Sequence, residues 1–485
     1  MKRFIIIIPL IFFLLVSCQQ NIEPDHAEIP VDEVLTRALS TGKVGPDDPI
    51  VFLPATNMKA WTDIGPLEER FAASEVPASR LSSMTTEALV KSMMNYPLNY
   101  LVFAYNDPKM AIDIIVKHSP LHKEFLSRPD AAEVFVDMYA AAELDMSLEK
   151  SNFDGDYKSL SYTNTIFMDH FLGSQNLNGL GQASVKQKLT EAVREKLQAR
   201  IQCSDMFSMS SIEPLLTIDE TYVLGTASLD TRAYIMSTIL VYTPLGKEIV
   251  GYVMSPTSQL EAEQMENQAV SEYPSAIVRG PATWSYNCHS YAWHNSSTEN
   301  DVWINSFLSV PSDLQLERYW ENDLYKESDT LTPDVEKVFY SNGDHSAVLL
   351  ANGNYQSKWG AWPLMEHALT YCPYLSTDIE FFKKRFDGFI DLTVSGQSPA
   401  VTNQNYSYNV YVPTEFNDLD ITLEWEVRFM DSEYPKPFDL IVAPDGKSAS
   451  LTCRDYGLFK IIVRGYCNEV FVARGQMDVI SMPAM

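Results

Sequence analysis

The chain has 485 residues, which exceeds one ordinary hydrophobic core and predicts about three domains. Its composition, 46% hydrophobic and 21% charged, is typical of a globular protein and excludes disorder along the whole chain. The formal net charge of −28, without any run of lysine and arginine, argues against a nucleic-acid partner, because a phosphate backbone is bound by a clustered basic surface.

An export signal is predicted over residues 1–17. Two basic residues precede an apolar run over 4–16 that is too short to span a bilayer permanently. The stretch Leu15-Val16-Ser17-Cys18 resembles the bacterial lipobox, which implies acylation of Cys18. We therefore expect a lipid-anchored, extracytoplasmic protein of the cell envelope, at the outer membrane or cell surface, whose membrane partner is reached through Cys18. The alternative is an ordinary secreted protein with a cysteine near its cleavage site.

Residues 18–50 predict a tether, because they are rich in Asp, Glu and Pro and lack an apolar period. A sorting signal beside the acylated cysteine is the alternative for this segment. Residues 51–230 then predict an all-α domain that binds or spaces and carries no recognisable chemistry.

Several helices are predicted within this domain. Ser82 and Ser83 precede one helical run, and Asp107-Pro108 supplies an N-cap and a first helical residue for a helix that ends at His118. Further helices are predicted over 129–143 and 184–200, the second with one apolar stripe.

A central α+β domain is predicted over 231–395. Two β-rich runs, 233–242 and 249–254, flank a Pro/Gly turn and predict a hairpin, and a helix is expected over 259–271. The segment Tyr286–His294 follows, and it contains a cysteine between an asparagine and a histidine.

Five cysteines remain after Cys18, and an odd number in an oxidising compartment leaves at least one thiol unpaired. Cys453 and Cys467 lie in one β-rich region and could pair. Cys288 is the candidate for the free thiol. Asn287 is a plausible N-cap directly before it, and a helix N-terminus favours the reactive thiolate.

The base for this thiol is expected from elsewhere in the chain. On an ideal helix His289 points about 100° and His294 about 240° away from Cys288, so neither shares its face. His345 is the best candidate, because it begins an apolar strand and could be held against a helix N-terminus as the partner of a thiolate.

The segments Asn287–Ala292 and Asp344–Tyr355 together resemble the papain-like superfamily, in particular the NlpC and CHAP families of bacterial cell-wall cysteine peptidases and amidases. The likeness covers about residues 275–392. It implies Cys288 as nucleophile, His345 as base, and no cofactor. It also implies a third residue that orients the histidine, and both Gln356 and Ser357 stay open for this role. A two-residue Asn352-Gly353 loop would place Gln356 on the sheet face of His345, whereas a three-residue bulged loop would place Ser357 there.

Other interpretations of these residues stay open. Cys288 could be a buried structural cysteine, His345 a core histidine, and a zinc site could use Cys288 with His289 and His294, although its ligand spacing is unusual. Six of the eight tryptophans fall in this domain and could line a groove or fill the core, so Trp284, Tyr291 and Trp359 are candidate substrate-binding residues.

Residues 396–485 predict an all-β, immunoglobulin-like sandwich without a site of its own. The segment 421–427 alternates strictly between apolar and polar residues, and further short strands are expected at 406–412, 440–442, 458–463 and 470–472.

The expected function is that of a cysteine hydrolase that cleaves amide or peptide bonds, with peptidoglycan stem peptides or related peptides as partners by resemblance. Two alternatives remain: a non-catalytic envelope lipoprotein that binds a peptide or glycan, and a Cys–His acyltransferase of transglutaminase type, which uses the same pair of side chains.

Overall fold

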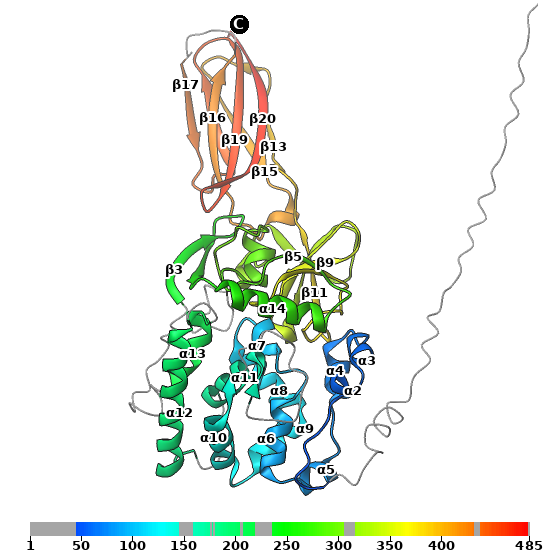
Figure 1. Cartoon of the computed structure of the whole chain (residues 1–485). Helices are drawn as coiled ribbons and strands as arrows, with labels where there is room; N and C mark the ends of the chain where they lie inside the picture. The colour runs from blue at the N-terminus through cyan, green and yellow to red at the C-terminus, as the bar shows by residue number, and fades with distance from the viewer. Residues whose placement is uncertain are drawn as a thin grey trace, which may run out of the picture. The chain divides into compact units, whose positions relative to one another are not determined.

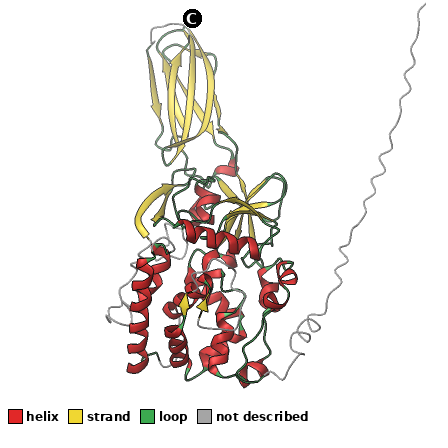
Figure 2. Ribbon diagram, viewed as in Figure 1, coloured by secondary structure: helices red, strands yellow, loops and turns green. Residues whose placement is uncertain are grey.

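The computed structural model describes residues 45–144, 159–174, 177, 180–203, 207–218, 235–304, 316–430 and 437–483. The predicted export signal, Cys18 and the tether up to residue 44 lie outside these ranges. Helices form the N-terminal part of the described chain and predominantly antiparallel sheets form the C-terminal part (Figures 1 and 2). No helix within the described ranges is long and apolar enough to cross a membrane.

Short helices build the N-terminal region, with one small sheet of β1 (Glu143–Leu144) and β2 (Ser159–Leu160) among them. The helices are α2 (Leu53–Thr56), α3 (Met58–Thr62), α4 (Leu67–Ala73), α5 (Ala78–Ser83), α6 (Thr86–Met94), α7 (Leu101–Ala104), α8 (Pro108–His118), α9 (Pro120–Ser127), α10 (Ala131–Ala141), α11 (Tyr162–Ser174), α12 (Ala183–Gln202) and α13 (Met209–Ile218).

Side-chain caps set where several of these helices begin. The carboxylate of Asp107 accepts a hydrogen bond from the Lys109 N–H at 2.9 Å, and Pro108 is the first residue of α8, which confirms the predicted start of this helix. The predicted start after Ser83 is wrong for α6: its cap is Thr85, whose hydroxyl accepts from a main-chain N–H of the first turn. The reason is that Ser83 ends a separate helix, α5.

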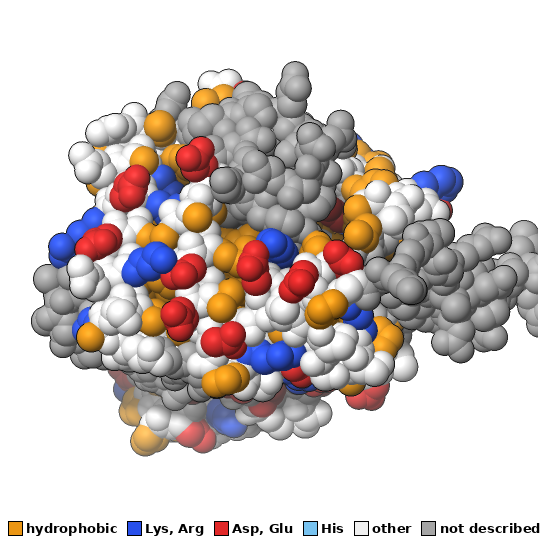
Figure 3. All heavy atoms as spheres, turned by 60° about the horizontal axis from the view of Figure 1, so that its bottom comes forward, with side chains coloured by type: hydrophobic (Ala, Val, Ile, Leu, Met, Phe, Trp, Pro, Cys, Tyr) orange, Lys and Arg blue, Asp and Glu red, His pale blue; other side chains and the backbone are white. Residues whose placement is uncertain are grey.

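On the face of the helical region drawn in Figure 3, acidic and basic side chains are intermingled. Ion pairs also join basic and acidic side chains of the helical region, for example Lys188 with Asp137 and Lys109 with Asp113.

A seven-stranded antiparallel sheet forms the central region, in the order β5-β10-β9-β8-β7-β11-β6. The hairpin of β3 and β4 and the helix α14 precede it, as predicted. The bounds are β3 (Ile235–Tyr242), β4 (Glu248–Met254), α14 (Gln259–Glu272), β5 (Ile277–Gly280), β6 (Tyr325–Ser328), β7 (Val335–Tyr340), β8 (His345–Leu349), β9 (Tyr355–Lys358), β10 (Leu364–His367) and β11 (Ile379–Lys384).

The loop between β8 and β9 has three residues. Val348 pairs with Gln356, and the Leu350 N–H donates to the Asn354 carbonyl at 2.8 Å, which leaves residues 351–353 as the loop. Gly353 has a φ of +85°, the left-handed conformation that such a bulged loop uses. Of the two open alternatives, this register places Ser357 rather than Gln356 on the sheet face of His345.

The helical and central regions share one hydrophobic core, and hydrogen bonds also join them at the end of α7. The Ala361 N–H donates to the Phe103 carbonyl at 2.8 Å, and the Tyr374 hydroxyl donates to the Ala104 carbonyl at 2.5 Å. Gly360 lies against the same two carbonyls with a φ of +52°, and no side chain would fit there. These contacts fix the chain that leads from α7 into α8.

The C-terminal region consists of two sheets around one hydrophobic core. One sheet has the order β12-β20-β19-β16, with β14 also paired to β20, and the other has the order β13-β15-β18-β17. The bounds are β12 (Ile390–Asp391), β13 (Thr393–Gly396), β14 (Ala400–Val401), β15 (Asn405–Tyr411), β16 (Thr422–Phe429), β17 (Phe438–Val442), β18 (Ser448–Cys453), β19 (Gly457–Cys467) and β20 (Val470–Met482).

The pairing of Cys453 with Cys467 that the sequence allowed is not present. Both thiols are buried and free. Cys453 ends β18, in the sheet β13-β15-β18-β17, and Cys467 ends β19, in the sheet β12-β20-β19-β16. Cys203, Cys288 and Cys372 are free as well. The described cysteines therefore include no disulfide, and Cys288 is one of five free thiols rather than the odd one left over.

Candidate functional site

Cys288 is the first residue of a short helical segment that continues as the π-helix Ser290–His294. The Asn287 Oδ1 atom accepts the Ser290 N–H at 3.1 Å, and the Asn287 carbonyl accepts the Tyr291 N–H at 3.0 Å. The predicted N-cap is thus confirmed.

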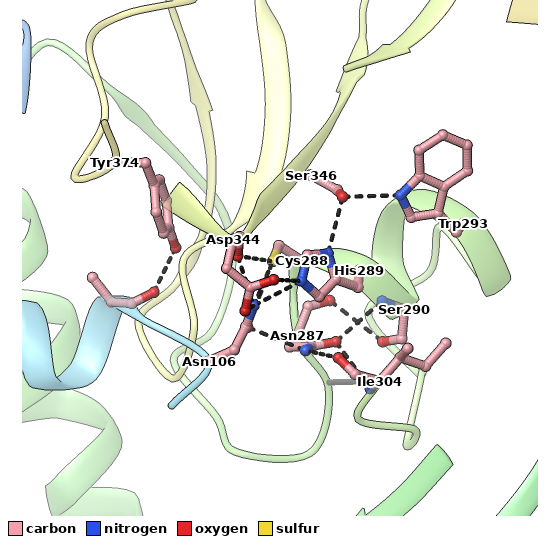
Figure 4. Close-up of polar contacts among 11 residues, drawn as sticks. Asn106, Asn287, Cys288, His289, Ser290, Trp293, Ile304, Asp344, Ser346 and Tyr374 are labelled. Carbon is pink, nitrogen blue, oxygen red and sulfur yellow. Dashed lines mark hydrogen bonds and ion pairs between the residues drawn. The ribbon is translucent and has the colours of Figure 1, made fainter. Parts of the chain in front are cut away.

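The imidazole of His289 is held on both sides (Figure 4). Its Nε2 atom lies 2.9 Å from Oδ1 of Asp344, and its Nδ1 atom lies 2.9 Å from Oγ of Ser346. Ser346 also accepts the indole N–H of Trp293 at 2.9 Å. All these groups are buried, with Cys288 and His289 at 0% and Asp344 at 1% exposure. Asp344 has a φ of +45°, a conformation that a non-glycine residue rarely adopts and that often marks a functional site.

Two negative neighbours decide the charge of His289. Burial lowers the pKa of His289, but the charges of Cys288 and Asp344 and hydrogen bonds to both outweigh it and raise the pKa of His289 to about 10. The imidazole is therefore protonated at neutral pH.

Asn106, from the connection between α7 and α8, completes this cluster. Its Nδ2 atom lies 3.3 Å from the Cys288 sulfur, 2.9 Å from the Asp344 carbonyl oxygen and 3.0 Å from Nε2 of His289. Its Oδ1 atom accepts from Nδ2 of Asn287 at 3.1 Å. Asn106 is 3% exposed. We name Asn106, Cys288, His289 and Asp344 the thiol cluster.

Neighbouring hydrogen bonds fix which way the Asn106 amide points. Oδ1 of Asn287 accepts the main-chain N–H groups of Ser290 and Ile304, so its Nδ2 group is the end that faces Asn106. Oδ1 of Asn106 must accept from that group, and its Nδ2 group must face the sulfur and the Asp344 carbonyl.

His345 begins β8, as predicted, but its ring contacts are different from those expected. The ring stacks on Tyr374 with centroids 3.5 Å apart, and neither ring nitrogen has a hydrogen-bond partner within the described part of the chain. Burial, followed by the nearby charges of His367 and His289, holds the pKa of His345 well below its usual range. His345 is therefore neutral, which differs from the charged partner expected from the sequence beside Cys288. Its role as the base stays a prediction.

That neither histidine of the helix acts as the base for Cys288 stays a prediction, but the structure brings His289 into contact with the same amide group of Asn106 as Cys288. The angle of about 100° per residue describes where side chains leave an ideal helix, whereas here Asn106 and Asp344 approach the helix end and contact both Cys288 and His289. His294 is exposed and lies outside the thiol cluster, as expected.

The two candidates for the orienting residue do not contact His345. The Ser357 hydroxyl lies 2.8 Å from Nε2 of His367 and accepts the indole N–H of Trp359 at 3.1 Å, so this serine orients a different histidine. Gln356 is half-buried on the opposite sheet face. The histidine held beside the Cys288 helix start is His289, and its ring contacts Asp344 and Ser346.

The candidate substrate-binding side chains belong to the core. Trp284 is 5%, Tyr291 6% and Trp359 0% exposed, so none of them presents an open face to a groove. Zinc binding by Cys288, His289 and His294 is not supported either: across the described ranges, no group of three or more His, Cys, Asp or Glu side chains is arranged to hold a metal ion.

Sequence reasoning missed two members of the thiol cluster. Asp344 could have been identified from the sequence, because it directly precedes the candidate base His345. Asn106 could not, because it lies 182 positions before Cys288 and reads as part of a loop before a helix N-cap.

Comparison with known proteins gives little beyond this geometry. No curated protein matches the chain. A solved structure, "Crystal structure of Putative membrane anchored protein from Corynebacterium diphtheriae", is similar over 34% of this chain and 43% of that chain, with 15% identity and a TM-score of 0.17, which is too low to define the fold. A family described as "Domain of unknown function (DUF7689)" matches residues 277–374, and this segment contains Cys288, His289, Asp344 and His345 but not Asn106.

Proposed function

We propose that the chain is a thiol-dependent hydrolase of amide bonds, with Cys288 as nucleophile and His289 as its acid and base. The observation that carries this proposal is the contact network itself: a thiol at the first turn of an Asn-capped helix lies beside a histidine that Asp344 holds and keeps protonated. Such an ion pair is how cysteine hydrolases obtain a nucleophile at neutral pH.

The reaction follows from these positions. The Cys288 thiolate attacks the carbonyl carbon, a C–S bond forms, and the oxyanion is held by main-chain N–H groups at the helix end. The imidazolium of His289 gives its Nε2 proton, which is directed to Asp344 in the resting structure, to the leaving amine as the C–N bond breaks, which leaves a thioester. Neutral His289 then takes a proton from water, whose hydroxide attacks the thioester and releases the acid and the Cys288 thiolate, while His289 is again protonated.

The wider proposal is a lipid-anchored envelope protein with a papain-like central domain and an immunoglobulin-like C-terminal domain, acting on peptidoglycan stem peptides or related peptides. The order of a cysteine at a helix start followed by an antiparallel sheet supports the first assignment. Two sheets around one core support the second. The lipobox-like sequence supports the anchor at Cys18.

Burial of the thiol cluster favours a second candidate, a non-catalytic envelope protein in which this cluster only stabilises the fold. Cys288 is 0% exposed, so a substrate can reach the sulfur only after the surrounding segments separate. A fully hydrogen-bonded polar cluster of this kind can also act as a structural lock.

The two candidates are separated by labelling and hydrolysis. Cys288→Ala should abolish both labelling by iodoacetamide at pH 6 and release of amines from stem peptides, whereas Cys372→Ala should change neither. Cys372 is a matched control because it is equally buried, and burial raises its pKa to about 12. Unchanged labelling and hydrolysis in Cys288→Ala would refute the hydrolase.

The identity of the histidine is tested in the same assay. His289→Gln should lower hydrolysis far more than His345→Gln, because only His289 lies in the thiol cluster. The reverse order would restore His345 as the base. Adding an amine acceptor and finding a cross-linked product instead of the acid would identify acyl transfer rather than hydrolysis.

A further inference from the structure

We infer that Asn106 is a catalytic residue of this site, delivered by the helical region, and that its amide N–H stabilises the Cys288 thiolate. The inference rests on the proposed function and deepens it. This inference gives the helical region a chemical role in the site. The residues on β9 that were expected to orient the histidine do not contact His289.

The Asn106 amide lies against the sulfur with both of its ends: Nδ2 is 3.3 Å and Oδ1 is 3.5 Å from the Cys288 sulfur. A thiolate has no hydrogen to give to Oδ1, so toward this form only Nδ2 can form a hydrogen bond. One Nδ2 hydrogen is directed to the Asp344 carbonyl at 2.9 Å, and the second lies between the Cys288 sulfur and Oδ2 of Asp344, each 3.3 Å from Nδ2. Nε2 of His289 is also near, but a protonated nitrogen bonded to Asp344 cannot accept this hydrogen. A donor aimed at sulfur lowers the free energy of the thiolate relative to the thiol.

The connection that carries Asn106 is held rigidly enough for this role. Hydrogen bonds from Ala361 and Tyr374 fix the carbonyls of Phe103 and Ala104, which lie three and two residues before Asn106. On the other side, Asp107 caps α8 through the Lys109 N–H. Asn106 itself is anchored at its oxygen by Asn287, the cap of the cysteine helix. The reactive centre is thus assembled from both regions of the chain.

The decisive measurement is the rate of Cys288 alkylation by iodoacetamide at pH 6 divided by the rate at pH 10, in the full chain. Opening of the buried cluster also depends on pH, so the opening equilibrium of segment 287–294 is measured at both pH values by amide hydrogen exchange and divided out of the two rates. The corrected ratio reports ionisation. An ordinary thiol reacts about 300-fold more slowly at pH 6 than at pH 10. The proposed hydrolase requires a ratio at least about tenfold higher than that of an ordinary thiol.

Three variants test the amide. In Asn106→Ala the ratio should fall about tenfold or more, as expected for loss of a hydrogen bond to a charged group. In Asn106→Asp, which keeps the shape but replaces the donor by an oxygen, it should fall further. Asn99→Ala is the matched control: Asn99 is buried in the same region and donates to the Met93 carbonyl and to Asn164, so the ratio should stay at the wild-type value.

The outcomes separate this inference from the proposed function. An ordinary ratio in the wild type would overturn the hydrolase itself. A raised wild-type ratio that is unchanged in Asn106→Ala, or a ratio closer to wild type in Asn106→Asp than in Asn106→Ala, would overturn the role of Asn106 and leave the hydrolase standing. A raised ratio that falls in both Asn106 variants and persists in Asn99→Ala supports both.

Discussion

Gly360→Ala offers the strictest test of how the helical region is joined to the thiol cluster. Gly360 has a φ of +52°, and a Cβ atom there would lie 2.4 Å from the Ala104 carbonyl oxygen and 2.5 Å from that of Phe103. The left-handed conformation costs a non-glycine residue about 1–2 kcal/mol. Displacing a packed backbone adds about 1–3 kcal/mol. We therefore expect Gly360→Ala to lose about 2–5 kcal/mol of unfolding free energy in urea denaturation.

Gly353→Ala is the matched control for this substitution. Gly353 also has a positive φ, +85°, but a Cβ atom there would meet nothing within 4 Å, so only the conformational cost of about 1–2 kcal/mol applies. Because Gly360 contacts the segment that leads to Asn106, its substitution should also accelerate Cys288 alkylation at pH 10, and Gly353→Ala should not. Equal destabilisation by the two substitutions, or equal alkylation rates, would refute the argument.

Two further substitutions test the buried charges. The pKa of His289 is raised from 6.5 to about 10, so the stabilisation it provides is fully present below pH 6.5 and is lost at about 1.4 kcal/mol per pH unit as the pH rises toward 10. In His289→Gln this loss between pH 7 and 9 should disappear from urea unfolding curves, and an unchanged slope would contradict the assignment. Arg200→Ala should cost about 3–5 kcal/mol in denaturant unfolding, because it removes the 2.6 Å ionic partner of the buried Asp169 carboxylate. Lys188→Ala breaks an exposed pair and should cost less than about 1 kcal/mol, so similar losses in these two variants would show that burial does not decide the effect.

Much of the secondary structure could be predicted because its causes are local. The start of α8 follows from an aspartate directly before a proline. The N-cap at Asn287 follows from its side chain, which accepts the main-chain N–H of Ser290 three residues later. The alternating segment of β16 likewise has Val427 buried and Glu424 exposed. The start of α6 could not be predicted in the same way, because Ser82 and Ser83 form the end of the preceding helix α5 and the N-cap of α6 is Thr85.

The sequence by itself determined that a cysteine begins a capped helix and that a histidine begins a later apolar strand, because both depend on neighbours along the chain. Only the tertiary structure decided which histidine lies in the thiol cluster. His289 is chosen over His345 by contacts with Asp344 and with Asn106, a residue 182 positions before Cys288. Side-chain hydrogen bonds over such separations depend on how two regions pack, and no local pattern of residue types encodes that packing.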